Sequence, residues 1–405
     1  MRTRYGISPW IHRYPDAKRP NFPRARGAVT ADVVIIGGGL TGCATARACA
    51  GAGLTTVVLE AGRIGQGSSG RSAGLLLPEP GPRFQEVVAA HGLRRARRAF
   101  ELWDEAATDA PALLRKARIS CGLEVRGMLV AAWAGDEPGL RREHDARQAA
   151  GLDVSWLAQP QALRQTRLDV AAAMRTGRGF AVDPYRACIG LAATGASRRL
   201  RVFERSSVSK ITTGRTGVEI ATAGATITAG TVVVTTGSAT AEFSALRRHF
   251  KAREDYLVLT EPLTDLMRKG VLRPGISVGD TATPSHRVEW TADHRILIRG
   301  AAQDATPERS RAAVRIQRTG QLMYEFLTMS PSISGLRPEY GWELSWGQTA
   351  DGLMYIGPHR NYPRHLFALG GGSDSIAGAF LSASILLRAL QGSADKADAL
   401  FSWAR

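Results

Sequence analysis

Apolar and polar positions in this chain follow two patterns, and the first begins close to the N-terminus. Residues 31–36 form a short apolar run that predicts a buried strand, and the run ends at glycines 37–39. Residues 40–50 are small and mostly apolar, which favours a helix, and a second apolar run, 57–59, ends at Glu60. This order of strand, glycine turn, helix and acid-terminated strand is typical of a dinucleotide-binding βαβ unit.

Each glycine of such a unit has a physical task. Gly37 permits the tight turn, Gly39 leaves room for a pyrophosphate beside the backbone, and Gly42 lets the helix pack on the strand. The unpaired N–H groups at the helix start, at Leu40 and Thr41, favour negative charge. We therefore expect the phosphates of a dinucleotide at this point.

The acid at the end of the second strand selects among nucleotides. Glu60 lies 23 residues after Gly37, and its carboxylate can accept hydrogen bonds from ribose hydroxyls. An acid here also repels a 2′-phosphate, which argues against NADP. A purely structural βαβ turn is the alternative, and the agreement of strand, helix and acid disfavours it.

The second pattern is the alternation of apolar and polar residues expected of antiparallel strands. It predicts a second sheet from residues 253–261, 286–291 and 294–300. Other elements are predicted by apolar spacing and turn residues. The helices are expected at 84–116, from Pro184 onward, at 306–329 and at 376–390. The strands are expected at 124–133, 200–204, 207–212, 218–222, 225–229 and 231–236.

Three further glycine-rich segments fit a ligand site. The loop 65–74 is too polar for a core, and its glycines and serines allow close backbone approach. Gly237 follows a buried strand, where a doubly wound sheet holds its ligand. The turn 370–373 opens the last helix and provides a second helix N-terminus.

Composition narrows the class of protein. A chain of 405 residues with 44% hydrophobic positions predicts two globular domains. No run of about eighteen apolar residues predicts a membrane span, and no secretion signal is evident. We therefore expect a cytoplasmic protein. The cysteines have no C-x-x-C spacing and predict neither a disulfide framework nor a metal site: Cys43, Cys49, Cys121 and Cys188.

The net charge of +17 raises the question of a polyanionic partner. The chain contains 47 Arg and only 6 Lys, a skew that reflects overall composition more than a binding stripe. The densest patches, residues 1–30 and 94–98, contain no nucleic-acid motif. We therefore expect a solvated basic surface and no nucleic-acid partner. Residues 1–30, with four prolines, predict an extended arm over the cofactor domain without a helix; a disordered tail is the alternative.

Four stretches of this chain, 32–60, 65–77, 232–237 and 349–376, resemble the FAD-dependent D-amino-acid oxidase (DAO) superfamily, which includes glycine, sarcosine and γ-glutamylputrescine oxidases. The resemblance implies an α/β fold: a Rossmann-like FAD-binding domain and a mixed or antiparallel-sheet substrate domain, both discontinuous in sequence. The boundaries expected are 1–30 for the arm, 31–85, 176–245 and 336–405 for the FAD-binding domain, and 86–175 and 246–335 for the substrate domain.

The resemblance also implies which residues bind FAD, without a covalent link. Besides the glycine turn, Glu60 would hold the adenosine ribose, and the segment at Val208 would meet the adenine. The full set implied is Gly37, Gly39, Leu40, Thr41, Gly42, Glu60, Ala61, Arg63, Ser69, Gly70, Arg71, Ser72, Val208, Gly237, Gly357, Gly371, Gly372 and Ser373.

Three departures from the family pattern stand out. Many relatives have Gly-Asn-Gly-Ile where this chain has residues 373–376, Ser-Asp-Ser-Ile. They also carry a Trp-x-Gly pattern where this chain ends in Leu344, and a frequent asparagine where it has Ser72. These departures leave FAD binding intact as an expectation, and they keep a non-catalytic flavoprotein open as an alternative function.

The implied reaction is oxidation of a small amine or amino acid by hydride transfer to flavin N5, giving an imine, with O2 or another carrier accepting the electrons. A substrate carboxylate would be bound by an arginine, either Arg253 or Arg287. The other candidates near the flavin are His286, Trp290, Tyr256, Trp346 and Tyr355. An NAD-dependent dehydrogenase is disfavoured because NAD would leave the C-terminal glycine turn without a purpose.

Overall fold

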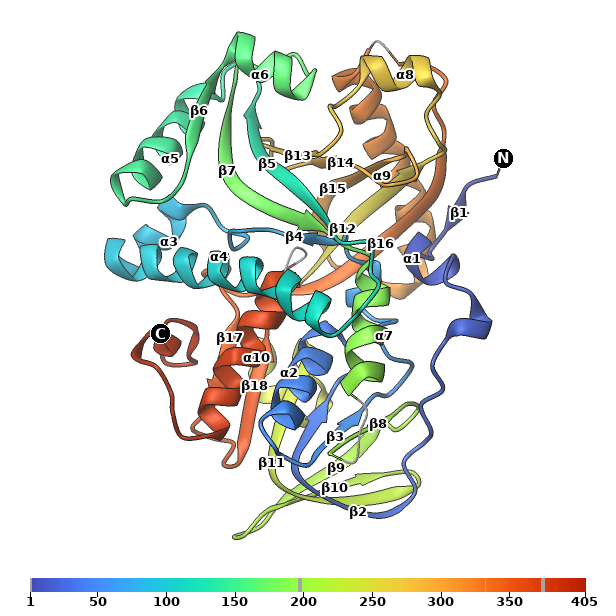
Figure 1. Ribbon diagram of the computed structural model, residues 1–405, viewed down its shortest axis with the longest axis vertical. Helices are drawn as coiled ribbons and strands as arrows, with labels where there is room; N and C mark the ends of the chain where they lie inside the picture. Colours follow the sequence, from blue (N-terminus) through green and yellow to red (C-terminus); the bar gives the residue numbers. More distant parts are fainter. Residues whose placement is uncertain (1, 196–198, 332, 373–375) are drawn as a thin grey trace.

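The structure is a computed structural model that describes residues 2–195, 199–331, 333–372 and 376–405. Two sheets lie at opposite ends of the molecule, and helices α3 (Phe84–His91) and α4 (Leu93–Lys116) lie across the region between them (Figure 1). Gly92, with φ +79°, separates these two helices, where the sequence predicted a single one over 84–116.

The first sheet is the predicted parallel, Rossmann-like layer, and we call it the cofactor sheet. Its strand order is β17-β18-β11-β2-β3-β8, with β9 and β10 extending it from β11. β18, β11, β2, β3 and β8 run parallel, whereas β17 is antiparallel to β18. The strands are β2 (Gly27–Ile36), β3 (Thr56–Leu59), β8 (Leu200–Phe203), β9 (Val208–Thr213), β10 (Val218–Thr222), β11 (Ala225–Gly237), β17 (Tyr355–Pro358) and β18 (His365–Leu369).

Helices cover one face of the cofactor sheet because its strands are apolar on both sides. α2 (Leu40–Gly51), α7 (Pro184–Gly195) and α10 (Ile376–Leu390) pack beside one another, and α4 packs on α10. Their small buried residues, including Cys43, Ala44 and Ala377, let the helices approach the strands closely. On the other face lie the β9–β10 hairpin and the 3₁₀ segment η3 (Ala241–His249).

The second sheet, the substrate sheet, is mixed and has the order β1-β16-β12-β15-β14-β13-β5-β7-β4, with β6 beside β7. Its strands are β1 (Arg4–Tyr5), β4 (Leu75–Leu76), β5 (Glu124–Ala132), β6 (Ser155–Ala158), β7 (Ala172–Ala181), β12 (Lys251–Thr260), β13 (Ile276–Asp280), β14 (Arg287–Trp290), β15 (Ile296–Asp304) and β16 (Pro338–Gln348). Its helices are α5 (Glu137–Ala149), α6 (Gln159–Thr166), α8 (Asp265–Gly270) and α9 (Glu308–Met329).

Several segments lie in a different layer from the one their predicted domain would give. β16 falls within the predicted FAD-binding segment 336–405, yet it pairs with β12 along most of its length in the substrate sheet. Helix α4 falls within the predicted substrate segment 86–175, yet it packs on α10 of the cofactor layer. The chain therefore crosses between the layers more often than the expected domain boundaries imply.

A buried ion cluster fastens α5 to the loop before α3. Arg147 on α5 forms ion pairs with Glu79 and, at 2.7 Å, with Glu143, and its side chain is only 7% exposed. Glu143 also accepts hydrogen bonds from the N–H groups of Phe84 and Gln85, at 2.7 and 3.2 Å. The cluster satisfies the first N–H groups of α3, which its N-cap residue does not.

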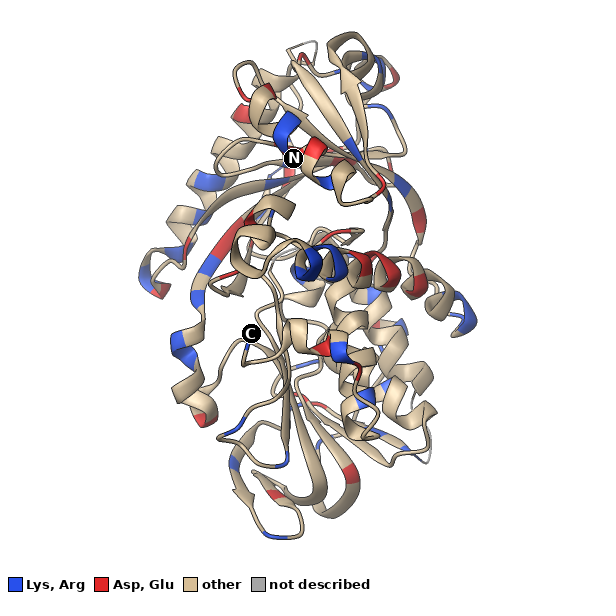
Figure 2. Cartoon of the chain, turned by 90° about the vertical axis from the view of Figure 1, so that its left-hand side faces the viewer, with Lys and Arg blue, Asp and Glu red and all other residues tan. Residues whose placement is uncertain are grey.

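Charged residues are dispersed over the whole chain. Figure 2 shows Lys and Arg scattered over both layers with Asp and Glu between them. In the dense patch 94–98, Arg97 pairs with Glu101 at 2.7 Å and Arg98 pairs with Glu105 at 2.8 Å. Nearby carboxylates therefore neutralise part of that patch. None of the helices in the described ranges is long and apolar enough to cross a bilayer.

The N-terminal arm differs from its prediction. A short helix, α1 (Pro9–His12), forms where none was expected, followed by a 3₁₀ turn, η1 (Asp16–Lys18). Ser8 caps α1 by accepting a hydrogen bond from the N–H of Ile11, and proline is favourable at the first helical position. The expectation of a helix-free arm was wrong because it weighed the number of prolines and overlooked this Ser-Pro start signal.

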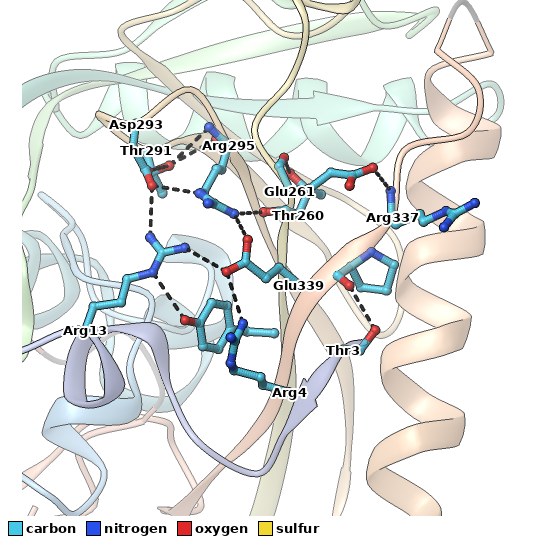
Figure 3. Close-up of polar contacts among 12 residues, drawn as sticks. Thr3, Arg4, Arg13, Thr260, Glu261, Thr291, Asp293, Arg295, Arg337 and Glu339 are labelled. Atoms are coloured by element: carbon cyan, nitrogen blue, oxygen red, sulfur yellow. Dashed lines mark hydrogen bonds and ion pairs between the residues drawn. The ribbon is translucent and has the colours of Figure 1, made fainter. Parts of the chain in front are cut away.

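The arm also lies on both layers and not on the cofactor domain alone. β1 pairs in parallel with β16 of the substrate sheet, while Trp10 donates a hydrogen bond to the carbonyl oxygen of Ser72 at 3.0 Å. Figure 3 shows how arginines fasten the arm: Arg4 and Arg13 reach Glu339 at 3.4 and 3.5 Å, and Arg295 holds the other oxygen of that carboxylate.

Candidate functional site

The first glycine turn is shaped by close backbone contacts that exclude side chains. Gly37 follows β2 with φ +111°, and a Cβ there would lie 2.7 Å from the carbonyl oxygen of Thr235 on β11. A Cβ at Gly42 would lie only 2.0 Å from the carbonyl oxygen of Gly37. The Thr235 hydroxyl donates to the carbonyls of Ile36 and Gly37 at 3.1 Å and fixes the turn. Glycine is therefore required at positions 37 and 42.

Gly39 leaves the start of α2 accessible. It is the N-cap residue of α2 and provides no side-chain cap. Among the described residues beyond its chain neighbours, only the hydroxyl oxygen of Ser69 lies within 4 Å of a Cβ built there, at 3.0 Å. That hydroxyl accepts a hydrogen bond from the N–H of Leu40 at 2.9 Å. The positive end of the helix dipole therefore faces an open backbone surface, which suits an anionic group.

Glu60 is held at the end of β3 by backbone N–H groups. Its Oε2 accepts from Gly38 and its Oε1 accepts from Gly62, both at 2.7 Å. A carboxylate has about four acceptor positions, so it can still accept hydrogen bonds from hydroxyls of a ligand. The predicted acid is thus fixed beside the glycine turn.

Two buried cysteine side chains, Cys43 and Cys188, contact the first glycine turn at the carbonyl oxygen of Gly38. Cys188 on α7 donates to the carbonyl oxygen of Gly38 at 3.4 Å and lies 3.7 Å from the sulfur of Cys43 on α2. The hydrogen bond to Cys43 and burial both raise the pKa of the Cys188 thiol, so it remains a protonated donor. All four cysteines are buried and free.

A cavity of about 820 Å³ opens at the carboxyl ends of β2 and β11. These neighbours are the point where the strand order reverses, because the chain runs from β2 to β3 on one side and β11 lies on the other. Ligands of doubly wound sheets bind at such a switch point. The structure brings these predicted cofactor residues together around the cavity: Gly37, Gly39, Leu40, Thr41, Glu60, Ala61, Ser69, Ser72, Val208, Gly237, Gly371 and Gly372.

The other predicted cofactor residues do not line the cavity. Gly42 packs against the turn, and a Cβ at Gly70 would lie 2.2 Å from the carbonyl oxygen of Gly65, so both shape the backbone. Arg71 points to the substrate sheet and pairs with Glu343 at 3.3 Å. Arg63 and Gly357 are also absent from the lining, and Ser373 lies outside the described residues.

The substrate sheet forms the opposite wall of the cavity. Arg253 on β12 and Trp346 on β16 are cross-strand neighbours, and both line the cavity. Trp346 Nε1 donates to Asp255 at 3.0 Å, and Asp255 in turn pairs with Arg299 at 3.3 Å, which holds the indole ring in place. Arg253 pairs with the exposed Asp304 at 2.5 Å. A cationic and an aromatic side chain thus face the glycine turn across the cavity.

His286 and Arg287, predicted as substrate residues, lie outside this lining. Arg287 is on β14, in the middle of the substrate sheet. His286 is enclosed by Asp280 and Glu325, at 2.8 and 3.0 Å. Burial disfavours the charged ring, but hydrogen bonds and charges of both carboxylates prevail and raise the pKa of His286. The contacts of His286, which directly precedes β14, with Asp280 on β13 and Glu325 on α9 therefore connect these three elements.

Tyr256 and Trp290 are core residues of the substrate domain. The Tyr256 hydroxyl bonds to Glu254 at 3.1 Å and to Thr306 at 3.2 Å, and Trp290 Nε1 donates to the carbonyl oxygen of Leu272 at 2.5 Å. Successive strand residues point to opposite faces, so Tyr256, three positions after Arg253, faces the core and not the cavity. Tyr355, the remaining aromatic candidate, stacks on Trp403 and is likewise absent from the lining.

One wall segment was missed by the sequence reading. The chain after Gly237 runs along the cavity and contributes Ser238, Glu242, Arg247 and Phe250. The signal was available, because the chain that follows the carboxyl end of a parallel strand borders the ligand crevice. Apolar periodicity carries no information about this segment, since it is a 3₁₀ turn without a regular period.

Residues 32–389 match the family model DAO, described as FAD-dependent oxidoreductase. The chain belongs to this family. It is 24% identical over 385 residues to gamma-glutamylputrescine oxidoreductase of Escherichia coli, covering 93% of this chain and 88% of that protein. It is 25% identical over 353 residues to glycine oxidase of Geobacillus kaustophilus, covering 84% of this chain and 87% of that protein.

The fold agrees with this assignment. The crystal structure of glycine oxidase from Geobacillus kaustophilus superposes with a TM-score of 0.77 at 22% identity, covering 93% of this chain and 99% of that chain. The predicted resemblance, the α/β fold and FAD as the cofactor are therefore confirmed. The cradle at Gly37, Gly39 and Gly42, which a Cβ would fill or narrow, fits such a dinucleotide.

Proposed function

We propose that this DAO-family protein oxidises a small amine or amino acid at the cavity between its two sheets. The observation that carries the proposal is that Arg253 and Trp346 line the same cavity as the glycine turn and Glu60. The names of the relatives, a gamma-glutamylputrescine oxidoreductase and a glycine oxidase, support an amine or amino-acid substrate.

The residues that would hold FAD follow from their positions around the cavity. The N–H groups at Leu40 and Thr41 would receive the pyrophosphate, and Glu60 would accept hydrogen bonds from the adenosine ribose. Val208, on the β9–β10 hairpin, lines the cavity and would meet the adenine. Gly371 and Gly372, before α10, would border the flavin.

When bound, FAD would supply a flavin ring able to accept a hydride from the carbon beside the substrate nitrogen, which would leave an imine for water to hydrolyse. Arg253 binds and orients a substrate carboxylate through its guanidinium, which is 22% exposed at the cavity wall. Trp346, fixed by Asp255, provides a rigid apolar wall that excludes water from the reacting carbon.

The experiment is anaerobic reduction of the bound FAD by glycine, N-methylglycine and putrescine, followed by absorbance. A charge-assisted hydrogen bond contributes about 1.5–3 kcal/mol, so Arg253→Met should raise the apparent Kd of a carboxylate substrate, read from the concentration dependence of the reduction rate, by roughly 10- to 150-fold. Lys251→Met is the matched control, because Lys251 pairs with the same Asp304 at 2.9 Å but is absent from the cavity lining.

The substrate class is determined by comparing how Arg253→Met changes the reaction of the amino acids and that of putrescine. If Arg253→Met weakens the reaction of amino acids and leaves that of putrescine unchanged, the arginine binds the carboxylate. Equal effects of Arg253→Met and Lys251→Met would contradict the role of Arg253 in binding the substrate carboxylate.

A non-catalytic flavoprotein is the second candidate, and one observation favours it. Leu344, at the position where relatives carry glycine, lines the cavity and narrows it with an apolar side chain. The other departure, at residues 373–375, lies outside the described residues. Bound FAD that no amine, amino acid or hydroxy acid reduces would establish this alternative.

A further inference from the structure

A second cavity, of about 840 Å³, lies behind the η3 segment. Five stretches far apart in the sequence line it: Thr231 on β11, Arg248 and His249 at the end of η3, residues 358–366 from the end of β17 into β18, Ala389 and Leu390 at the end of α10, and residues 402–404 near the end of the chain. Arg247 and Phe250, which flank Arg248 and His249 in the chain, line the first cavity instead. The two cavities therefore share the η3 segment as a partition.

The lining of this second cavity is one-sided in charge. It contains three arginines and three histidines, and none of its described residues is an Asp or a Glu: Arg248, Arg360, Arg364, His249, His359 and His365. Arg364 is used structurally, since its Nη2 donates to the carbonyl oxygen of Arg215 at 2.7 Å. The Nε of Arg248 donates to Nε2 of His249 at 3.4 Å. Arg248 and Arg360 are both exposed at the cavity.

The histidines report how closely these positive groups gather. Burial, together with the neighbouring charges of His249, Arg360 and Arg248, lowers the pKa of His359. Burial and Arg248 likewise lower the pKa of His249. Mutual repulsion of this kind is unfavourable unless an anion compensates it. A negatively charged group bound among these side chains would therefore be stabilised electrostatically.

Hydrogen-bond donors point to the same class of ligand. Nδ1 of His359 accepts from the N–H of Asn361 at 3.2 Å, so the neutral ring carries its proton on Nε2 as a donor. Trp403 Nε1 is buried and has no hydrogen-bond partner among the described residues. Guanidinium groups, a histidine N–H and an indole N–H together supply donors, and the described lining contains no carboxylate.

Aromatic rings provide the remaining surface. Trp403 stacks on Tyr355 with ring centroids 4.4 Å apart and an angle of 8°. His359 and His249 contact the edge of Trp403, at 5.1 and 5.5 Å. Tyr362 lies 5.4 Å from His359. Flat side chains at this spacing can accept a planar ring beside them.

We propose that this cavity is a second ligand site, distinct from the FAD cavity, for a small anion that carries a planar ring. The anionic group is a phosphate or a carboxylate bound by Arg248 and Arg360, and the ring lies beside Trp403. Two guanidinium groups suit either anion, because both present paired oxygens to the planar donor fork. A nucleoside monophosphate and an aryl carboxylate are the two sources of this chemistry.

The experiment is isothermal titration of the FAD-loaded protein with AMP, salicylate, adenosine and inorganic phosphate. FAD saturation keeps AMP out of the first cavity, and flavin absorbance of a filtrate checks that none is displaced. Each guanidinium contact to an anion is charge-assisted and therefore stronger than a hydrogen bond between neutral groups. The double variant R248Q/R360Q should therefore weaken binding at least tenfold. AMP binding tighter than salicylate assigns the phosphate source, and the reverse assigns the carboxylate source.

The matched control is R309Q/R337Q, which removes the same charge from exposed positions outside the second cavity's lining. Because Arg248 and Arg360 are exposed, their variants should fold and retain FAD, and Arg360→Gln alone provides a milder version. The proposal is overturned if neither AMP nor salicylate binds at millimolar concentration. It is also overturned if both double variants weaken binding equally, which would indicate general charge attraction.

Discussion

The glycine at position 42 offers the sharpest test of how the cofactor turn works. A Cβ at this position would lie 2.0 Å from the carbonyl oxygen of Gly37 and 2.7 Å from the hydroxyl of Thr235. Both neighbours are held, since Thr235 itself donates to that carbonyl at 3.1 Å. Gly42→Ala must therefore displace the turn that Gly37 forms, by about an ångström, at a typical overpacking cost of about 1–3 kcal/mol.

A second glycine in the same helix isolates this cost. Gly51 ends α2, and no atom of the described residues lies within 4 Å of a Cβ built there, apart from its chain neighbours and the helix's own backbone. Alanine improves helix propensity at either position by up to about 1 kcal/mol. The propensity gain is therefore shared, and the difference between Gly42→Ala and Gly51→Ala measures the collision at the turn. We expect this difference to be about 1–3 kcal/mol.

The assay is FAD affinity of the apoprotein by fluorescence quenching, with thermal unfolding measured in parallel. If the displaced turn no longer fits the pyrophosphate, the Kd of FAD rises by roughly 5- to 150-fold for Gly42→Ala, from the same 1–3 kcal/mol. Gly51→Ala should bind as the unaltered protein does. FAD affinity of Gly42→Ala within twofold of the control, with equal unfolding temperature, would refute the reasoning.

Two further predictions concern stability. Arg147→Met leaves the buried carboxylates of Glu79 and Glu143 without a compensating charge. We therefore expect the free energy of unfolding, measured with denaturant, to fall by about 3–5 kcal/mol. The control Arg141→Met, at an exposed position of the same helix, should lower it by less than about 0.5 kcal/mol. The raised pKa of His286 contributes stability that is complete below the unfolded value, about 6.5, and is lost as pH rises through the folded value. His286→Gln should flatten this pH dependence of unfolding, and an unchanged slope would show that Asp280 does not stabilise a charged ring.

The cofactor half of the site could be predicted because its determinants are local. Gly37, Gly39 and Gly42 lie within six positions, and Glu60 follows at a distance set by one helix and one strand. Their meeting depends only on a βαβ unit, whose geometry short-range patterns specify. Arg253 and Trp346 are 93 positions apart and meet through strand pairing, which periodicity does not reveal.

Alternation also could not rank the aromatic candidates. Tyr256 and Arg253 lie on the same strand, β12, and both satisfy a strand pattern, yet one faces the core and the other the cavity. A two-residue period separates the faces of a strand but does not say which face meets a ligand. The fold of the neighbouring layer decides this, since α9 covers the face that carries Tyr256.

Strand β16 joins the two halves of the site. Three hydrogen bonds link it to the loop at Ser68–Arg71: the Ser68 hydroxyl donates to the carbonyl of Ser345 at 3.0 Å, Arg71 donates to the carbonyl of Glu343 at 3.3 Å, and Trp342 Nε1 donates to the carbonyl of Arg71 at 2.8 Å. The same strand carries the cavity residue Trp346. The loop at Ser68–Arg71, which lines the cavity through Ser68 and Ser69, is therefore coupled to the strand that forms the opposite cavity wall. Arg71, which does not line the cavity, is connected to the cavity wall through this link. β16, expected in the FAD-binding domain, belongs to the substrate sheet because it pairs with β12.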